Sequence, residues 1–154
     1  MDFIVDSNLL VLWIVGVTAP AHLGRHKNLK GFDPGDYDLL LKLTTGARSI
    51  QVTPHILAET SNLIRQIGDP LRQQLTRALG QRIAGLSEIF VESREAADDR
   101  IFPRLGLTDA TIMNLAQGKA VVLTTDAILY RALLDRGLNA ENFNYHRDTL
   151  YGSS

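Results

Sequence analysis

The segment FIVDSNLL, residues 3–10, decides the fold that the sequence predicts. It opens with three apolar residues, two of them β-branched, which run straight into Asp6 and are followed by an apolar helical pattern. A buried parallel strand that ends in a carboxylate has this pattern. Because ligands in open α/β sheets sit just beyond the carboxyl ends of the strands, we expect Asp6 to point into a crevice.

The size and charge of the chain limit the classes of protein that fit it. Its 154 residues match a single domain over 1–154, and its 45% hydrophobic content is enough for one core. The net charge is −1, so an anionic partner must be attracted by a local basic patch or by a bound metal ion. The absence of cysteine excludes disulfides and thiolate metal sites, and it fits a cytoplasmic protein.

An apolar run, Leu9–Val17, lies close to the N-terminus. Asp2 and Asp6 precede it and no lysine or arginine does, so it lacks the basic region of a signal peptide. The run is also too short to span a bilayer. We interpret it as a core helix and expect no membrane partner.

Strand-like and helix-like patterns alternate along the chain, which predicts a three-layer α/β/α fold with a mostly parallel central sheet and helices on both faces. The expected strands cover residues 2–5, 50–52, 88–92, 121–123 and 142–145. The expected helices cover residues 8–16, 36–45, 54–67, 70–86, 108–117 and 127–136, with Asp69 and Thr108 as N-caps. Residues 17–35 and 93–107 are expected to be irregular, and the first of these is a long insertion rich in basic residues.

Asp126 repeats the pattern of Asp6, because it follows the predicted buried strand 121–123 at the start of a helix. If both strands are parallel and near the centre of the sheet, the two carboxylates meet at the same edge. Taken singly, each is equally well explained as a helix N-cap.

Glu59 and Asp109 are the other two candidate acidic residues. Glu59 lies three residues after Ile56 and four before Leu63, on the predicted apolar face of its helix. A carboxylate there is costly unless it is paired, protonated or metal-bound, and a buried salt bridge is the alternative explanation. Asp109 shares a helix face with Ile112, and a favourable interaction with the helix dipole is the alternative for it.

Taken together, four carboxylates in one crevice repel one another and cannot all stay ionised without cations. An oxygen-only cluster with no cysteine and no suitably spaced histidine suits Mg²⁺ or Mn²⁺ rather than Zn²⁺. Such an ion lowers the pKa of a bound water and stabilises the charge on the attacking and leaving oxygens. The residues therefore indicate metal-assisted hydrolysis of a phosphodiester.

Four short motifs carry a resemblance to a known family. They are Ile4–Asn8, Thr53–Leu63, Leu107–Ala110 and Val122–Asp126. In this order and at this spacing they resemble the PIN-domain nucleases, most of all the stand-alone bacterial toxins of the VapC type. The resemblance spans residues 4–126 and implies a PIN-like fold and a Mg²⁺- or Mn²⁺-dependent endoribonuclease.

The resemblance also implies roles for individual residues. The catalytic set is Asp6, Glu59, Asp109 and Asp126. The three aspartates would hold the metal, and Glu59 would hold it or orient the attacking water. Asn8 and Thr125 match positions where the family often keeps a supporting polar residue. Asn62, one helical turn after Glu59, can point the same way.

The partners that the resemblance implies are an RNA substrate, an antitoxin protein and a second copy of the chain. Basic residues should flank the acidic cluster to bind RNA phosphates. The candidates are Arg25, Lys27, Lys30 and Arg104, although a single basic residue is more often solvated surface charge. The apolar stripe from Leu71 to Leu86 is expected to form either a dimer interface or core.

Two rival functions stay open at this point. One is a non-enzymatic PIN-like module that binds RNA or protein. The other is phosphoryl transfer through an aspartyl intermediate at Asp6, which is disfavoured because Asn8 stands where such phosphatases have a second aspartate and no partner lysine is evident. DNA in place of RNA as the substrate also stays open.

Overall fold

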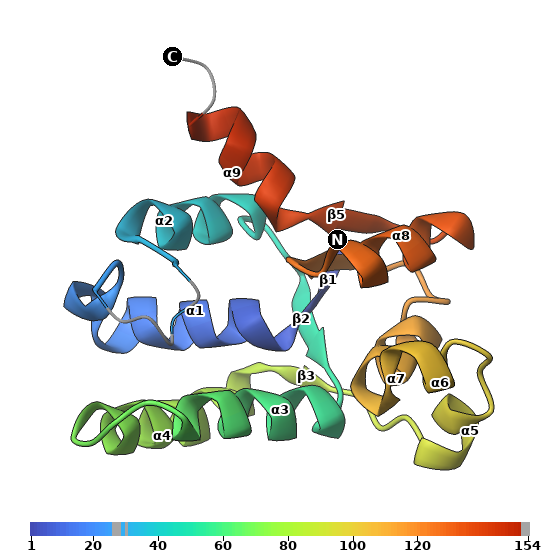
Figure 1. Cartoon of the computed structure of the whole chain (residues 1–154), viewed down its shortest axis with the longest axis horizontal. Helices are drawn as coiled ribbons and strands as arrows, with labels where there is room; N and C mark the ends of the chain where they lie inside the picture. The colour runs from blue at the N-terminus through green and yellow to red at the C-terminus, as the bar shows by residue number, and fades with distance from the viewer. Residues whose placement is uncertain (26–28, 30, 152–154) are drawn as a thin grey trace.

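A central sheet of five parallel strands organises the molecule in a computed structural model that describes residues 1–25, 29 and 31–151 (Figure 1). The strands are β1 (Asp2–Val5), β2 (Ser49–Val52), β3 (Ser87–Glu88), β4 (Val121–Thr124) and β5 (Ala140–Asn142). Their order across the sheet is β3-β2-β1-β4-β5, with every neighbouring pair parallel. The predicted α/β class with a parallel central sheet is therefore confirmed.

Helices connect each strand to the next. The first group is α1 (Ser7–Thr18), α2 (Pro34–Leu43), α3 (Pro54–Arg65) and α4 (Leu71–Arg82), with single 3₁₀ turns at Pro20–His22 and Ile83–Gly85. The second group is α5 (Ser93–Ala97), α6 (Phe102–Leu105), α7 (Leu107–Leu115), α8 (Ala127–Asp135) and α9 (Phe143–Tyr151). From β1 the chain moves outward in one direction to β2 and β3, and it then returns to β4 on the other side of β1 and moves outward in the opposite direction to β5. Because crossovers between parallel strands are right-handed, the two directions place their helices on opposite faces of the sheet.

The core lies around β1 and α1. Ile4, Leu9, Leu12 and Ile14 have no exposed surface, as the apolar opening segment predicts. Helix α1 packs on α3 and α4, and it also lies close to α2, because a Cβ at Gly16 would come within 2.1 Å of the Tyr37 ring. In the described residues, no helix is both long and apolar enough to cross a membrane.

The stripe from Leu71 to Leu86 is core and not a free interface. Leu71, Leu75 and Leu79 are buried within this chain, and the partly buried Ile83 and Leu86 pack against the same hydrophobic core. Of the two roles that the sequence left open for this stripe, the structure therefore supports the core.

The predicted N-cap of the helix that carries this stripe is wrong. Helix α4 begins after Pro70 without a side-chain cap. Asp69 instead pairs with Arg72 at 2.6 Å.

Three other predicted boundaries are wrong. The strand expected at 88–92 is only the two residues of β3, because this edge strand pairs with β2 alone and Phe90 beyond it is exposed. The segment 93–107, expected to be irregular, contains α5 and α6. The strand expected at 142–145 ends at Asn142, whose side-chain oxygen accepts a hydrogen bond from the Asn144 backbone N–H and so favours the start of α9.

The basic insertion at 17–35 is attached to the core by its apolar residues. Leu23, Leu29 and Phe32 are buried. Helix α1 continues to Thr18, and α2 starts at Pro34 behind a capping box between Asp33 and Asp36. The segment between these two helices is therefore shorter than expected.

Candidate active site

Asp6 sits at the carboxyl end of β1, where the chain turns into α1. It is 5% exposed, and both of its carboxylate oxygens are bonded. Oδ1 accepts from the Ser7 backbone N–H at 2.8 Å, and Oδ2 accepts from the Thr124 hydroxyl at 2.7 Å. The hydroxyl of Ser7 is buried and has no hydrogen-bond partner among the described residues, so this corner contains a polar atom that the described protein atoms leave unsatisfied.

Thr124 connects the ends of the two central strands. Its Oγ1 donates to Asp6 and accepts from the Asp126 backbone N–H at 3.0 Å. Sequence reasoning misses Thr124 and names its neighbour Thr125 instead. The signal was present, because pairing Val5 with Leu123 in parallel sets Thr124 beside Asp6.

Asp126 is both a helix cap and a neighbour of Asp6. Its Oδ1 accepts from the backbone N–H groups of Ile128 and Leu129 at 2.9 and 3.1 Å, so the N-cap explanation holds. The bridge through Thr124 also sets it at the same sheet edge as Asp6. The two explanations that the sequence offered are therefore compatible.

Asp109 lies in the first turn of α7 and is half-buried. The helix begins at Leu107 behind Gly106, whose φ of 89° favours glycine, so the predicted N-cap at Thr108 is wrong. The hydroxyls of Thr53 and Thr111 share a hydrogen bond of 3.1 Å, and Thr53 caps α3. This bond ties the helix of Asp109 to that of Glu59.

Glu59 is exposed, so its predicted place on the apolar face of its helix is wrong. The buried residues Ile56, Thr60 and Ile64 define the side of α3 that faces the core. At 3.6 residues per turn, Glu59 lies roughly 100° around the helix from the centre of that side. Asn62 is exposed as well. Glu59 therefore needs no buried salt bridge and lies at the rim of the candidate site.

Asp6 and Asp109 are affected by the negative charges of the other candidate carboxylates. Burial raises the pKa of Asp109 to about 7, and the negative charges of Asp6, Asp126 and Glu59 contribute to the rise. Burial also raises the pKa of Asp6, with Glu59 and Asp126 adding to it and the hydrogen bonds from Thr124 and Ser7 opposing it. The residues picked from the sequence are thus neighbours in space.

The donor set fits a hard divalent cation by chemical type, because carboxylate oxygens are the ligands that Mg²⁺ and Mn²⁺ prefer. Although their charges interact, no three acidic or histidine side chains of the described ranges surround one point closely enough to hold an ion together. Mg²⁺ is usually bound by one or two carboxylates, with water and substrate phosphate as its other ligands. Binding of that kind does not require three converging side chains.

A polar pocket of about 360 Å³ opens beside Asp126. Its lining residues are Asn8, Phe32, Thr125, Asp126, Asn144 and Arg147. Sequence reasoning names Asn8, Thr125 and Asp126 but misses Asn144 and Arg147. These two belong to the segment that was expected to be an edge strand and its continuation, and only a helix there brings them to the pocket.

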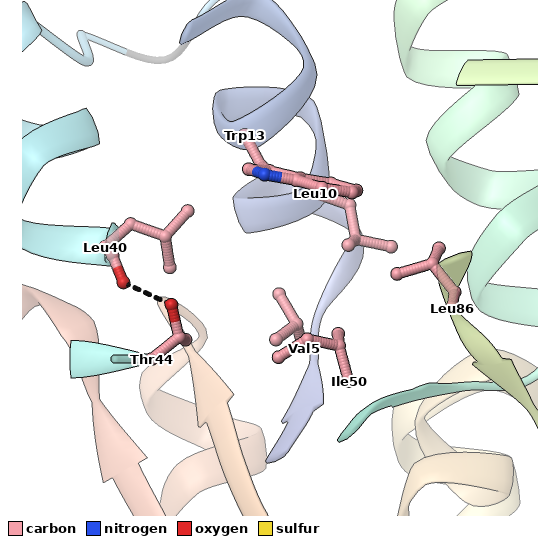
Figure 2. A pocket seen from close by; sticks show the side chains of 7 residues that line it. All are labelled: Val5, Leu10, Trp13, Leu40, Thr44, Ile50 and Leu86. Atoms are coloured by element: carbon pink, nitrogen blue, oxygen red, sulfur yellow. Dashed lines mark hydrogen bonds between the residues drawn. The ribbon is translucent and has the colours of Figure 1, made fainter. Parts of the chain in front are cut away.

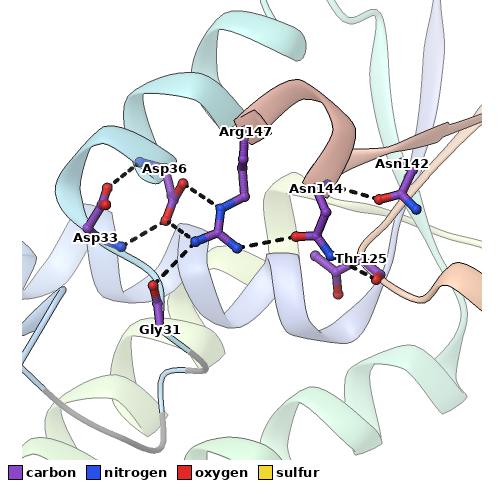
Figure 3. A network of polar contacts seen from close by, with 7 residues as sticks. All are labelled: Gly31, Asp33, Asp36, Thr125, Asn142, Asn144 and Arg147. Atoms are coloured by element: carbon purple, nitrogen blue, oxygen red, sulfur yellow. Dashed lines mark hydrogen bonds and ion pairs between the residues drawn. The ribbon is translucent and has the colours of Figure 1, made fainter. Parts of the chain in front are cut away.

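Arg147 and Asn144 are held by the network in Figure 3. The Arg147 guanidinium donates to both carboxylate oxygens of buried Asp36 at 2.8 and 3.0 Å, and to Asn144 Oδ1 at 3.2 Å. Asn144 Nδ2 donates to the backbone oxygen of Thr125 at 3.2 Å. The ion pair between buried Asp36 and half-buried Arg147 is therefore linked to the residue that precedes Asp126.

The structure describes two of the four basic residues that were predicted to bind RNA. Arg25 and Arg104 are exposed, and Arg104 lies on α6, just before the helix of Asp109. Lys27 and Lys30 fall outside the described residues.

A second pocket, of about 50 Å³, lies away from the carboxylates between β1, α1 and α2 (Figure 2). Six of its seven lining residues are apolar, among them Val5, Leu10 and Trp13. The seventh is Thr44, whose hydroxyl donates to the backbone oxygen of Leu40 at 2.8 Å. Because this pocket is small and its lining is almost wholly apolar, we do not place a site there.

No protein-family model matches the chain, and no curated protein matches it in sequence.

Proposed function

We propose that the protein is a Mg²⁺- or Mn²⁺-dependent endoribonuclease that acts in the cytoplasm. The observation that carries the proposal is the crowding of Asp6, Asp109, Asp126 and Glu59 at one edge of a parallel sheet, where burial and their charges raise the pKa of Asp109 to about 7. Carboxylates gathered in this way favour a bound divalent cation, because the cation relieves their repulsion. The order of the motifs, which resembles that of PIN-domain nucleases, supports RNA as the substrate.

In this proposal each residue has a separate task. Asp6, Asp109 and Asp126 supply the carboxylates of the metal site, one or two of them binding the ion directly and the rest acting through its bound waters. Thr124 fixes Asp6 relative to Asp126 through its two hydrogen bonds. The ion, when bound, activates a water and stabilises charge on the phosphate oxygens. Exposed Glu59 at the rim orients the attacking water. Asp109 must lose its proton before it binds the metal, so protons and metal compete there.

The toxin role rests on the resemblance alone. It extends the proposal to an antitoxin protein as inhibitor and to a homodimer as the assembled form. A PIN-like module that binds RNA or protein without cleaving it is the alternative to be separated from the enzyme by experiment.

The test is cleavage of structured and single-stranded RNAs in Mg²⁺, in Mn²⁺ and in EDTA. We expect cleavage with either metal, none in EDTA, and a loss of at least about a hundredfold in Asp6→Asn. Asp38→Asn, which changes an exposed aspartate on α2, is the matched control and should cleave as the unmodified protein does. Cleavage that persists in Asp6→Asn would overturn the proposal, and RNA binding without any cleavage would favour the binding module.

A further inference from the structure

The polar pocket beside Asp126 is continuous with the candidate active site. Asp126 lines it, and so does Asn8, which follows Asp6 by two residues in the first turn of α1. A group in this pocket would therefore be attached to, or lie next to, whatever the carboxylates act on. Its volume of about 360 Å³ falls within the range of pockets that hold small ligands.

The charges around the pocket do not suit a phosphate. Among the described residues, Arg147 is the only cation that lines it, and that guanidinium is already paired with buried Asp36 through two hydrogen bonds. Asp126 adds a negative charge to the wall. A second phosphate would meet no unpaired positive charge from these lining residues, so the ligand is a neutral group.

The remaining groups suit the edge of a nucleobase. The pocket has two side-chain amides, on Asn8 and Asn144, and a hydroxyl on Thr125, whereas Phe32 lines it as a buried core residue with Arg147 over its ring. Amides provide both donors and acceptors, which is how proteins read base edges. An unpaired base exposes the edge that such groups contact, whereas a base in a duplex does not.

The amide of Asn144 is held in one orientation. Arginine can only donate, so its bond to Asn144 fixes the oxygen toward Arg147 and the NH₂ toward Thr125, another lining residue, whose backbone oxygen accepts one of the two N–H groups. The second N–H is a pre-oriented donor for an acceptor atom of a ligand. A fixed donor discriminates between ligands better than a freely rotating one.

We propose that this pocket binds the unpaired nucleobase of the nucleotide next to the cleaved phosphate, which makes single-stranded RNA the substrate class and gives the enzyme a base preference at that position. This inference rests on the proposed function. Asn144 and Thr125 are then the specificity-determining residues, and Arg147 positions Asn144.

The experiment compares kcat/KM for single-stranded RNAs that share one mapped cleavage site. The RNAs carry each of the four bases, or an abasic sugar, at one nucleotide beside that site, and a duplex of the same sequence is included. We expect the abasic RNA to be cleaved about tenfold more slowly than the best base, with the duplex slower still. The abasic RNA needs no altered protein, so this arm does not depend on whether a variant folds.

The variants are Asn144→Ala and Thr125→Val, with Asn139→Ala as the matched control. Asn139 is exposed and precedes β5, so it lies at the opposite edge of the sheet. We expect Asn144→Ala and Thr125→Val to narrow the spread of rates among the four bases severalfold, and Asn139→Ala to leave it unchanged. If RNA is cleaved with no dependence on the base or its absence, this inference is overturned and the nuclease stands. If no RNA is cleaved with any metal, the proposed function fails and this inference fails with it.

Discussion

At the scale of single residues, Asp109 shows how the candidate site lowers the stability of the fold. The pKa of its half-buried carboxyl is about 7, against an ordinary value of 3.8, because burial and three neighbouring carboxylates disfavour its charge. Between these two values the folded chain binds a proton that the unfolded chain does not. The stability that the protonated form contributes is therefore lost as the pH rises toward 7.

The variant Asp109→Asn tests how much the charge of Asp109 lowers the free energy of unfolding. In EDTA at pH 8 we expect the substituted amide, which carries no charge, to raise the free energy of unfolding by about 1–3 kcal/mol over the unmodified protein. At pH 5 the folded carboxyl is neutral, but the unfolded one, with its ordinary pKa of 3.8, is still ionised, so the difference should be smaller than at pH 8 without reaching zero. Urea unfolding at both pH values measures it, and an equal difference at pH 5 and pH 8 would show that charge is not the cause.

At the scale of elements, the hydrogen bonds between Asp36 and Arg147 join α2 to α9, which lie side by side in Figure 1. Asp36 has no exposed surface, and Arg147 also donates to the backbone oxygen of Gly31. Removing one partner of a buried pair leaves the other charge without compensation, whereas removing both avoids that penalty.

We expect Arg147→Met to lower the free energy of unfolding by about 2–4 kcal/mol. Asp36→Asn combined with Arg147→Met should cost less than the sum of the two single changes, because the double variant leaves no unpaired buried charge. Arg131→Met, which affects an exposed pair with Asp135, is the control and should cost less than about 1 kcal/mol. Additive effects in urea unfolding would contradict a role for the pair in joining the two helices.

The sequence predicts best the elements whose signal is local. The apolar strands before Asp6 and Asp126 and the proline-led start of α3 are found from short patterns alone. The strand predicted at 88–92 is too long, because an alternating pattern does not show how far the neighbouring strand, β2, extends beside it. The start of α9 is missed because the capping role of Asn142 was not recognised.

The same distinction applies to the site. Asp6 and Asp126 follow from the rule that ligands lie at strand ends. Thr124, Asn144 and Arg147 were missed because their importance comes from hydrogen bonds to residues far along the chain, such as the 118 positions between Asp6 and Thr124. Glu59 was found, but its burial was misjudged because spacing to Ile56 and Leu63 does not locate the centre of a helix face.

At the scale of the whole molecule, the parallel sheet explains why distant carboxylates meet. β1 and β4 are neighbours, so the residues after them share one edge although 120 positions separate Asp6 from Asp126. A net charge of −1 provides no general attraction for RNA. In our proposal a bound divalent cation therefore supplies the positive charge that brings a phosphate to this edge.

The most direct test of the central claim is a calorimetric titration of the purified, metal-free protein with Mn²⁺ at pH 8 and pH 6. We predict that the protein binds Mn²⁺ at pH 8 and that the affinity falls severalfold at pH 6, because protons compete with the metal for Asp109. At pH 8 we expect Asp6→Asn to weaken Mn²⁺ binding more than about tenfold and Asp38→Asn to leave it unchanged. Folded protein that binds no Mn²⁺ at pH 8, or that binds it equally well after Asp6→Asn, would contradict the claim that these carboxylates form a metal site.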